Sequence, residues 1–315
     1  MGRFKMDESL SIAATGLTKR FGDTTAVNDL SLNIRRGEIY GFLGLNGAGK
    51  TTTIRMLLGM IKPNAGSVSL FGTEVWPGQR AIWARVGYMV ETPHAYADLT
   101  VRENLEIIRR LRKLNNANAV EKVIEQLQLT RDANRRAGTL SHGNAQRLGL
   151  AKALIHSPDL LILDEPANGL DPAGIVEIRN LLRDLADKHG VTIFMSSHIL
   201  SDVARLATRI GVIHRGRLVK ELNSIELAEQ EGQRLEVDVR DIMTALTVLE
   251  KAGIATRSNG ENSLTVTDKE AIQHPDRVAT LLVQAGCPPI RLVVGQAELE
   301  SYFLELVGMK DGEKQ

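Results

Sequence analysis

The stretch Gly44-Leu45-Asn46-Gly47-Ala48-Gly49-Lys50-Thr51 fits the phosphate-loop pattern G-x-x-x-x-G-K-[ST]. It follows residues 38–43, which predict a strand, and it opens residues 50–60, whose apolar spacing predicts a helix. Glycines let successive backbone N–H groups turn toward a phosphate, and the helix N-terminus adds a positive dipole. We expect the Lys50 ammonium to reach the β- and γ-phosphates and the Thr51 hydroxyl to ligate Mg²⁺. The residues expected to hold the nucleotide in this segment are Asn46, Gly47, Gly49, Lys50, Thr51 and Thr52.

Two carboxylates close an apolar run further along the chain. Residues 159–164 are typical of a buried parallel strand, and Asp164 and Glu165 stand at its end. We expect Asp164 to hold Mg²⁺ directly or through water, and Glu165 to orient the attacking water or accept its proton. An Asp-Glu pair at a strand end is often merely solvated, so its meaning depends on the phosphate loop upstream.

His198 follows a second apolar run, residues 191–196. A lone histidine is more often packed or exposed than catalytic. Here it comes at the carboxyl end of a predicted parallel strand, which is where α/β sheets bind ligands. The position therefore favours a contact between His198 and the γ-phosphate.

The segment Leu140-Ser141-His142-Gly143-Asn144 precedes an amphipathic helical pattern. Ser141 can cap that helix, because a side-chain oxygen can accept a hydrogen bond from the first turn. A capped helix N-terminus can also bind an anion. Taken alone, the segment favours the simple cap.

The chain of 315 residues divides by pattern into two parts. Residues 7–224 alternate short strands with longer helices, which is an α/β pattern, and a helical block runs over residues 92–156. Within it, residues 101–129 are helical throughout in pattern, with Leu105, Ile108, Leu111 and Leu114 on one face. Residues 225–315 follow the order β-α-β-β-α-β, which predicts a small α+β ferredoxin-like domain without a catalytic motif.

Composition excludes several classes of protein. The single cysteine, Cys287, cannot form an intrachain disulfide, and this fits a reducing cytosol. The formal net charge of +1 predicts no general attraction to nucleic acid. No stretch approaches the roughly 18 consecutive apolar residues that span a bilayer.

These motifs, in this order, resemble the nucleotide-binding domains of ATP-binding-cassette (ABC) transporters over residues 10–222. Residues 44–51 resemble the Walker A motif, residues 160–165 the Walker B motif with its catalytic glutamate, residues 168–171 the D-loop, and His198 the switch histidine. Phe21 falls where the family stacks an aromatic ring on adenine. The resemblance implies a P-loop NTPase cassette with a RecA-like core, an antiparallel β subdomain and a helical subdomain.

The resemblance also implies a dimer that ATP closes and hydrolysis opens. In this family two domains meet head to tail, so Ser141 and Gly143 would bind the γ-phosphate that Lys50 of the partner chain holds. The partner would be a second copy of this chain or a related chain. Such a pair powers transport through a separate membrane permease, which would hold it at the cytoplasmic face of the membrane. No nucleic-acid partner is expected.

Three departures from the family pattern stand out. The signature turn reads Leu140-Ser141-His142-Gly143-Asn144 in place of LSGGQ, Glu91 replaces a usual Gln, and Ala167 replaces a common hydroxyl residue. The Glu91 oxygen can still ligate Mg²⁺, although it adds negative charge beside the phosphates. Glu91, the wording of the phosphate loop and the extra C-terminal domain resemble the ABC-2 type branch that exports drugs, antibiotics or lipid-like substrates.

Two alternatives compete with the transporter reading. A soluble ABC ATPase that acts on ribosomes or DNA usually carries two cassettes or a long coiled-coil insertion, and this chain has one cassette and a modest helical segment. A cassette that does not hydrolyse ATP is disfavoured because Lys50, Asp164, Glu165 and His198 are all present. The transporter reading predicts that a cytoplasmic helix of the permease docks near Glu91.

Overall fold

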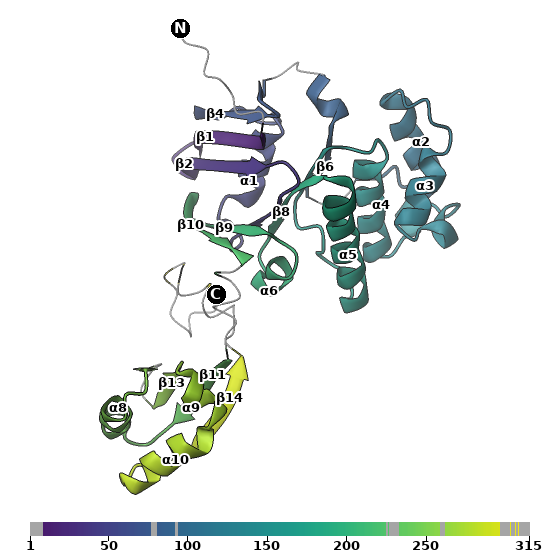
Figure 1. Ribbon diagram of the computed structural model, residues 1–315. Helices are drawn as coiled ribbons and strands as arrows, with labels where there is room; N and C mark the ends of the chain where they lie inside the picture. The colour runs from purple at the N-terminus through teal and green to yellow at the C-terminus, as the bar shows by residue number, and fades with distance from the viewer. Residues whose placement is uncertain are drawn as a thin grey trace. The chain divides into compact units, whose positions relative to one another are not determined.

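A computed structural model describes residues 9–76, 81–91, 94–224, 226, 233–258, 262–296, 303, 306 and 308. The chain divides into two compact units, Met1–Ser224 and Ile225–Gln315. Figure 1 shows the sheets of the first unit with helices around them, and the second unit with its own sheet and the helices α8, α9 and α10. Within the described residues, every helix is too short or too polar to cross a bilayer.

An antiparallel sheet begins the first unit, in the order β2-β1-β4-β5 (Figure 1). Its strands are β1 (Leu10–Phe21), β2 (Thr24–Arg35), β4 (Ala65–Leu70) and β5 (Thr73–Glu74). The second half of β2 alternates buried Leu30, Leu32 and Ile34 with exposed polar residues. This period of two turns one face of the sheet toward the core and leaves the other in solvent.

The second sheet of this unit is mainly parallel, in the order β10-β9-β3-β8-β7-β6. Its strands are β3 (Ile39–Leu43), β6 (Val86–Met89), β7 (Leu160–Leu163), β8 (Thr192–Ser197), β9 (Arg209–His214) and β10 (Arg217–Asn223). Only the β9–β10 pair at one edge is antiparallel. Every residue of β3, β7 and β8 is buried, as in a sheet covered on both faces. Their carboxyl ends meet at one edge, so the segments that follow them come together.

Helix α1 (Lys50–Leu57) contacts the antiparallel sheet and shares one core cluster with both sheets. Phe194 of β8 anchors that core, with ring centroids 5.8 Å from Tyr40 and 5.3 Å from Phe42. Burial of each such side chain contributes about 1.5–3 kcal/mol to folding. Helices α5 (Pro172–His189) and α6 (Leu200–Ala204) contact the parallel strands, α5 contacting β8 and α6 contacting β3 and β8. The phosphate loop is therefore carried on a rigid, fully packed support.

The helical block consists of separate helices rather than one continuous segment over residues 101–129. It contains α2 (Val101–Leu111), α3 (Ala119–Gln126) and α4 (His142–Leu154), and the first unit also has short 3-10 turns η1 (Ala81–Ala84), η2 (Thr130–Asp132) and η3 (Ala137–Thr139). Helix α2 begins at a capping box, in which Thr100 Oγ1 accepts from Glu103 N at 3.2 Å and Glu103 Oε2 accepts from Thr100 N at 2.8 Å. It ends just before Lys113, whose φ of 54° is left-handed and stops the helix.

The second unit is a four-stranded antiparallel sheet with helices. Its elements are β11 (Gln233–Asp238), α8 (Ile242–Lys251), β12 (Thr256–Ser258), β13 (Ser263–Val266), α9 (Lys269–Gln273), α10 (Pro275–Gln284) and β14 (Arg291–Gln296). The strand order is β12-β13-β11-β14, so β13 lies between β11 and β12 in the split β-α-β arrangement. Leu235, Val237, Leu249 and Leu282 belong to its separate core cluster. The hairpin turn predicted at Asn259-Gly260 lies outside the described residues.

Candidate active site

The phosphate loop connects β3 to α1 and is fixed at both ends. Gly44 N donates to Ser197 O at 3.1 Å, and Ala48 N donates to Leu45 O at 3.1 Å. Gly49 has a φ of 109°, and a Cβ at this position would lie 2.6 Å from Ala26 O, so only glycine follows this path. Gly47 is also left-handed, with open space where a side chain would be. The first N–H groups of α1 have no partner within the helix and can bind an anion.

Lys50 joins this loop to the end of β7. The side chain is nearly buried, at 6% exposure. Its Nζ donates to Gly44 O at 2.5 Å and lies 3.3 Å from Glu165 Oε1. The ammonium therefore lies over the phosphate loop and within reach of the Glu165 carboxylate.

Thr51 and Asp164 provide neighbouring oxygen atoms at the carboxyl edge of the sheet. Thr51 Oγ1 donates to Asp164 Oδ2 at 2.8 Å, and Asp164 is only 4% exposed. A hydroxyl and a carboxylate fit Mg²⁺, which is held in proteins by one or two carboxylates together with substrate phosphates. Across the described part of the chain no cluster of three or more His, Cys, Asp or Glu side chains could hold a metal. The Thr51 hydroxyl and the Asp164 carboxylate can supply two oxygen ligands to an ion that also binds phosphate.

Ser196 holds both acidic residues in place, and the sequence motifs did not assign it a role. Its Oγ donates to Asp164 Oδ1 at 2.5 Å and accepts from Glu165 N at 3.0 Å. The contact follows from strand register, because Leu163 of β7 is opposite Met195 of β8 in a parallel pair. The residues after these two, Asp164 and Ser196, are therefore neighbours.

Glu165 lies between two groups that can carry positive charge. Its Oε1 faces Lys50 Nζ, and its Oε2 lies 2.9 Å from His198 Nδ1. The backbone of Glu165 is left-handed, with a φ of 49°. That conformation costs a non-glycine residue about 1–2 kcal/mol, and such residues gather at functional sites. A carboxylate held in this way can orient a water molecule and accept its proton.

Ser141 and Gly143 lie at the N-terminus of α4. Ser141 Oγ accepts from Asn144 N at 3.3 Å, which caps the helix. In the part of a single chain that the structure describes, no hydrogen bond joins either residue to the phosphate loop. Gln146 of the same helix is 4% exposed and donates through Nε2 to Glu165 O and Pro166 O, both at 3.2 Å. Gln146 thus supports the backbone that carries Glu165.

The remaining predicted residues occupy the rim of the site and its surroundings. Phe21 ends β1 with half of its surface exposed, and Lys19 Nζ lies 5.2 Å from its ring centroid. Asn46 is exposed in the phosphate loop, and Thr52 lies in the first turn of α1. Glu91 forms an ion pair with Arg55 of α1. Among the described contacts, none brings Glu91 to Thr51 or Asp164.

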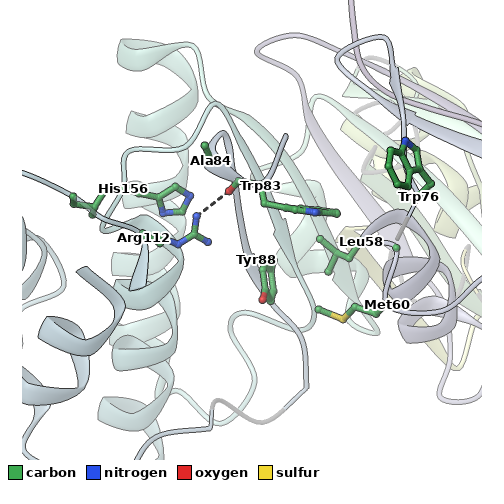
Figure 2. Close-up of a pocket in the computed structure, with 10 residues that line it drawn as sticks. Leu58, Met60, Trp76, Trp83, Ala84, Tyr88, Arg112 and His156 are labelled. Atoms are coloured by element: carbon green, nitrogen blue, oxygen red, sulfur yellow. Dashed lines mark hydrogen bonds between the residues drawn. The ribbon is translucent and has the colours of Figure 1, made fainter. Parts of the chain in front are cut away.

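A groove lies between the parallel sheet and the helical block. One part is a cavity of about 620 Å³, where Leu58, Met60, Trp83 and Tyr88 gather in Figure 2. A second part shares Met60 and Tyr88 with the first and extends past Glu91. Apolar and aromatic side chains therefore dominate a surface that no sequence motif marks.

Arg112 and His156 close the groove on the side of the helical block. Arg112 donates to Trp83 O at 2.8 Å, the dashed line in Figure 2. His156 Nε2 lies 3.0 Å from Val86 O, and its buried Nδ1 has no partner among the described atoms. Burial and the nearby Arg112 guanidinium lower the pKa of His156 to about 4, so the ring is neutral at pH 7.

Comparison with known proteins gives the same family as the sequence motifs. A model of the ABC transporter family matches residues 27–168. The bacitracin transport ATP-binding protein BcrA of Bacillus licheniformis is 40% identical over 300 residues, which cover 95% of this chain and 98% of that protein. The Nod factor export ATP-binding protein I of Burkholderia lata is 38% identical over 92% of this chain and 94% of its own. A bacterial ABC transporter cassette solved as a dimer has a TM-score of 0.63 and 25% identity, over 68% of this chain and 98% of that one.

Proposed function

The chain belongs to the family of ABC-transporter ATP-binding proteins, and from this premise we propose that it hydrolyses ATP to power export through a separate membrane permease. The observation that carries the proposal is the cluster of Lys50, Thr51, Asp164, Glu165 and His198 at one edge of the sheet. This cluster combines a phosphate cradle, two oxygen ligands and a base. Those are the parts that phosphoryl transfer to water requires.

Each side chain has a distinct part in the hydrolysis. The phosphate loop and Lys50 hold the β- and γ-phosphates, and Phe21 offers its exposed ring to the adenine. Thr51 and Asp164 would hold Mg²⁺, which would neutralise charge on the phosphates. Glu165 orients the attacking water and takes its proton, while the water oxygen bonds to the γ-phosphorus and ADP leaves. His198 holds the Glu165 carboxylate through Nδ1, and we propose that its ring also contacts the γ-phosphate.

A second subunit completes the nucleotide site. Ser141 and Gly143 present an anion-binding helix N-terminus, and a solved relative is a dimer of cassettes. We propose that this turn binds the γ-phosphate held by the Lys50 loop of a partner, which is a second copy of this chain or a related chain. ATP then binds the closed dimer more tightly than the open one, which is the requirement for a motor.

The groove beside Glu91 is proposed as the docking site of the permease. Its apolar and aromatic lining suits an amphipathic helix, and Arg55 and Glu91 offer charged groups at its border. Docking there would hold the chain at the cytoplasmic face of the membrane. Two matched relatives that span over nine-tenths of the chain are named for bacitracin transport and Nod factor export. They favour a drug, antibiotic or lipid-like substrate over action on ribosomes or DNA.

The substitution Glu165→Gln tests the proposal. The variant keeps the phosphate cradle but lacks the base, so ATP binding should persist while hydrolysis falls by a factor on the order of 10² to 10⁴. Light scattering should show ATP-driven dimerisation of this variant. Glu125→Gln, on the exposed side of α3, is the matched control and should hydrolyse ATP like the parent. Hydrolysis by Glu165→Gln near the parent rate would refute the role of Glu165.

Coupling to transport needs the permease. Co-expression with a candidate permease and purification of the complex should yield ATPase activity that rises with the transported compound. In vesicles, substrate movement should require hydrolysable ATP. A chain that never associates with a membrane protein, but hydrolyses ATP in response to ribosomes or DNA, would contradict the transport role.

A further inference from the structure

The ring of His142 packs against the loop that follows Glu165 in the same subunit. A Cβ built on Gly169 would lie 1.9 Å from His142 Cδ2 and 2.2 Å from Nε2. No real Cβ approaches another atom this closely, so the edge of the imidazole occupies the space that a side chain at residue 169 would need. Gly169 also has a left-handed φ of 75°. The proposed hydrolysis gives His142 no part, and the family pattern has a glycine at its position.

Two further contacts join the start of α4 to the same loop. A Cβ on Gly143 would lie 3.3 Å from Leu170 Cδ2, so the Leu170 side chain lies against this glycine. Gln146 donates to the carbonyls of Glu165 and Pro166, as described above. The start of α4 therefore touches the loop at its beginning, near residue 165, and at its far end, near residues 169 and 170.

The start of α4 is also anchored through Asn144. Asn144 Nδ2 donates to Asp132 Oδ2 at 2.8 Å, and Arg135 donates to Asp132 Oδ1 at 2.6 Å. The start of α4 thus contacts both Asp132 and loop 165–171. These contacts give a physical route by which a shift of the Ser141 turn can reach the loop.

We infer that His142 is a positioning residue that fixes loop 165–171, and with it Glu165, to the Ser141 turn. This inference rests on the proposed function. A nucleotide held by the partner against Ser141 and Gly143 would then also restrain the base in this subunit's own site. A misplacement of about 1 Å in a catalytic group can lower the rate by about 10²-fold, so a modest loosening of the loop is enough to matter.

The shape of the ring separates positioning from direct contact with phosphate. His142→Ala removes the ring and should lower kcat on the order of tenfold, with less than about a twofold change in KM for ATP. His142→Phe keeps a planar ring edge but has no ring nitrogen, and it should restore most of the activity. If His142→Phe is as slow as His142→Ala, the polar atoms carry the effect and the positioning role is wrong.

A double-mutant cycle with Gly169 tests the contact itself. Gly169→Ala in the parent adds backbone strain and also places a methyl group in the space of the ring. In the His142→Ala background the nearest ring atoms are gone, and only the backbone strain remains. The ring must move aside to admit the methyl group, so the fall in kcat should be about fivefold larger in the parent than in the His142→Ala background.

Equal effects in both backgrounds would overturn the inference. Tryptophan fluorescence should confirm that each variant is folded. If Gly169→Ala fails to fold while the double variant folds, the coupling between residues 142 and 169 appears in folding stability instead of in kcat. Failure of Glu165→Gln to bind ATP would instead refute the proposed function, so the two failures are distinguishable.

Discussion

Replacement of Ser196 by alanine removes one oxygen atom that two functional residues share. Ser196 is fully buried, and its hydroxyl connects the Asp164 carboxylate to the Glu165 backbone N–H. Alanine leaves the carboxylate without one of its donors and the N–H without its acceptor. The change in volume is small, so lost hydrogen bonding rather than a cavity dominates the effect.

The magnitude follows from the two lost bonds. A hydrogen bond to a charged group contributes about 1.5–3 kcal/mol, and an unsatisfied buried donor costs about 1–3 kcal/mol. The two effects overlap at one atom, and Asp164 keeps its bond from Thr51. We therefore expect Ser196→Ala to lower the free energy of unfolding of the first unit by about 3 kcal/mol. We expect kcat to fall about 10- to 100-fold, because both acidic residues lose a common support.

The two tryptophans of the chain make the assay specific. Trp76 and Trp83 both belong to the first unit, so urea unfolding followed by tryptophan fluorescence reports on that unit. Ser197→Ala is the matched control, since the Ser197 hydroxyl bonds only the backbone of Ile199 among the described residues. The control should lose about 1 kcal/mol. Unfolding of Ser196→Ala within about 0.5 kcal/mol of the parent, or a larger loss in the control, would refute the reasoning.

Three further predictions concern other parts of the molecule. Lys50→Ala should weaken ATP binding about 10- to 100-fold in a titration with a fluorescent analogue, because a charge-assisted contact to phosphate is lost; unchanged affinity would contradict the phosphate-loop assignment. The lowered pKa of His156, about 4, means that the unfolded chain takes up a proton below about pH 6.5 while the folded chain does not. The free energy of unfolding should therefore fall as the pH drops from 6.5 toward 4. In urea titrations His156→Gln should reduce that fall by about 1–2 kcal/mol, a value lowered for partial solvent screening. Parallel pH curves of the parent and the variant would exclude the effect. Asp241 caps α8 by accepting from Thr244 N at 3.1 Å, so Asp241→Ala should speed hydrogen exchange in α8 roughly fivefold without changing ATPase activity; unchanged exchange would show that the cap is unimportant.

Features set by neighbouring residues could be predicted from the sequence. The strand, glycine loop and helix around Lys50 follow from local pattern and spacing, and the structure has them in that order. The proximity of Thr51 to Asp164 follows from the rule that parallel strands end at one edge. The same rule places Ser196 at this edge of the sheet. Its bond to Asp164 could not be predicted, because it depends on which strands are neighbours and on their register.

Features set by distant contacts could not be predicted in this way. No glycine or proline interrupts residues 101–129, yet α2 ends at Leu111 and the next residue, Arg112, bonds to Trp83 O across the groove. The helical period placed Leu105 and Leu111 on one face, but Leu105 is buried and Leu111 is 73% exposed. Periodicity shows which residues share a face and does not show how far a neighbouring element covers it. The Arg55–Glu91 pair likewise depends on where α1 lies beside the end of β6.

The fit of the His142 ring onto Gly169 links the two positions over generations. A side chain at residue 169 would come within 1.9 Å of the ring, so it is accommodated only where the ring moves aside or residue 142 becomes smaller. Among descendants of this gene, loss of the glycine should therefore be more frequent where the histidine has already been lost.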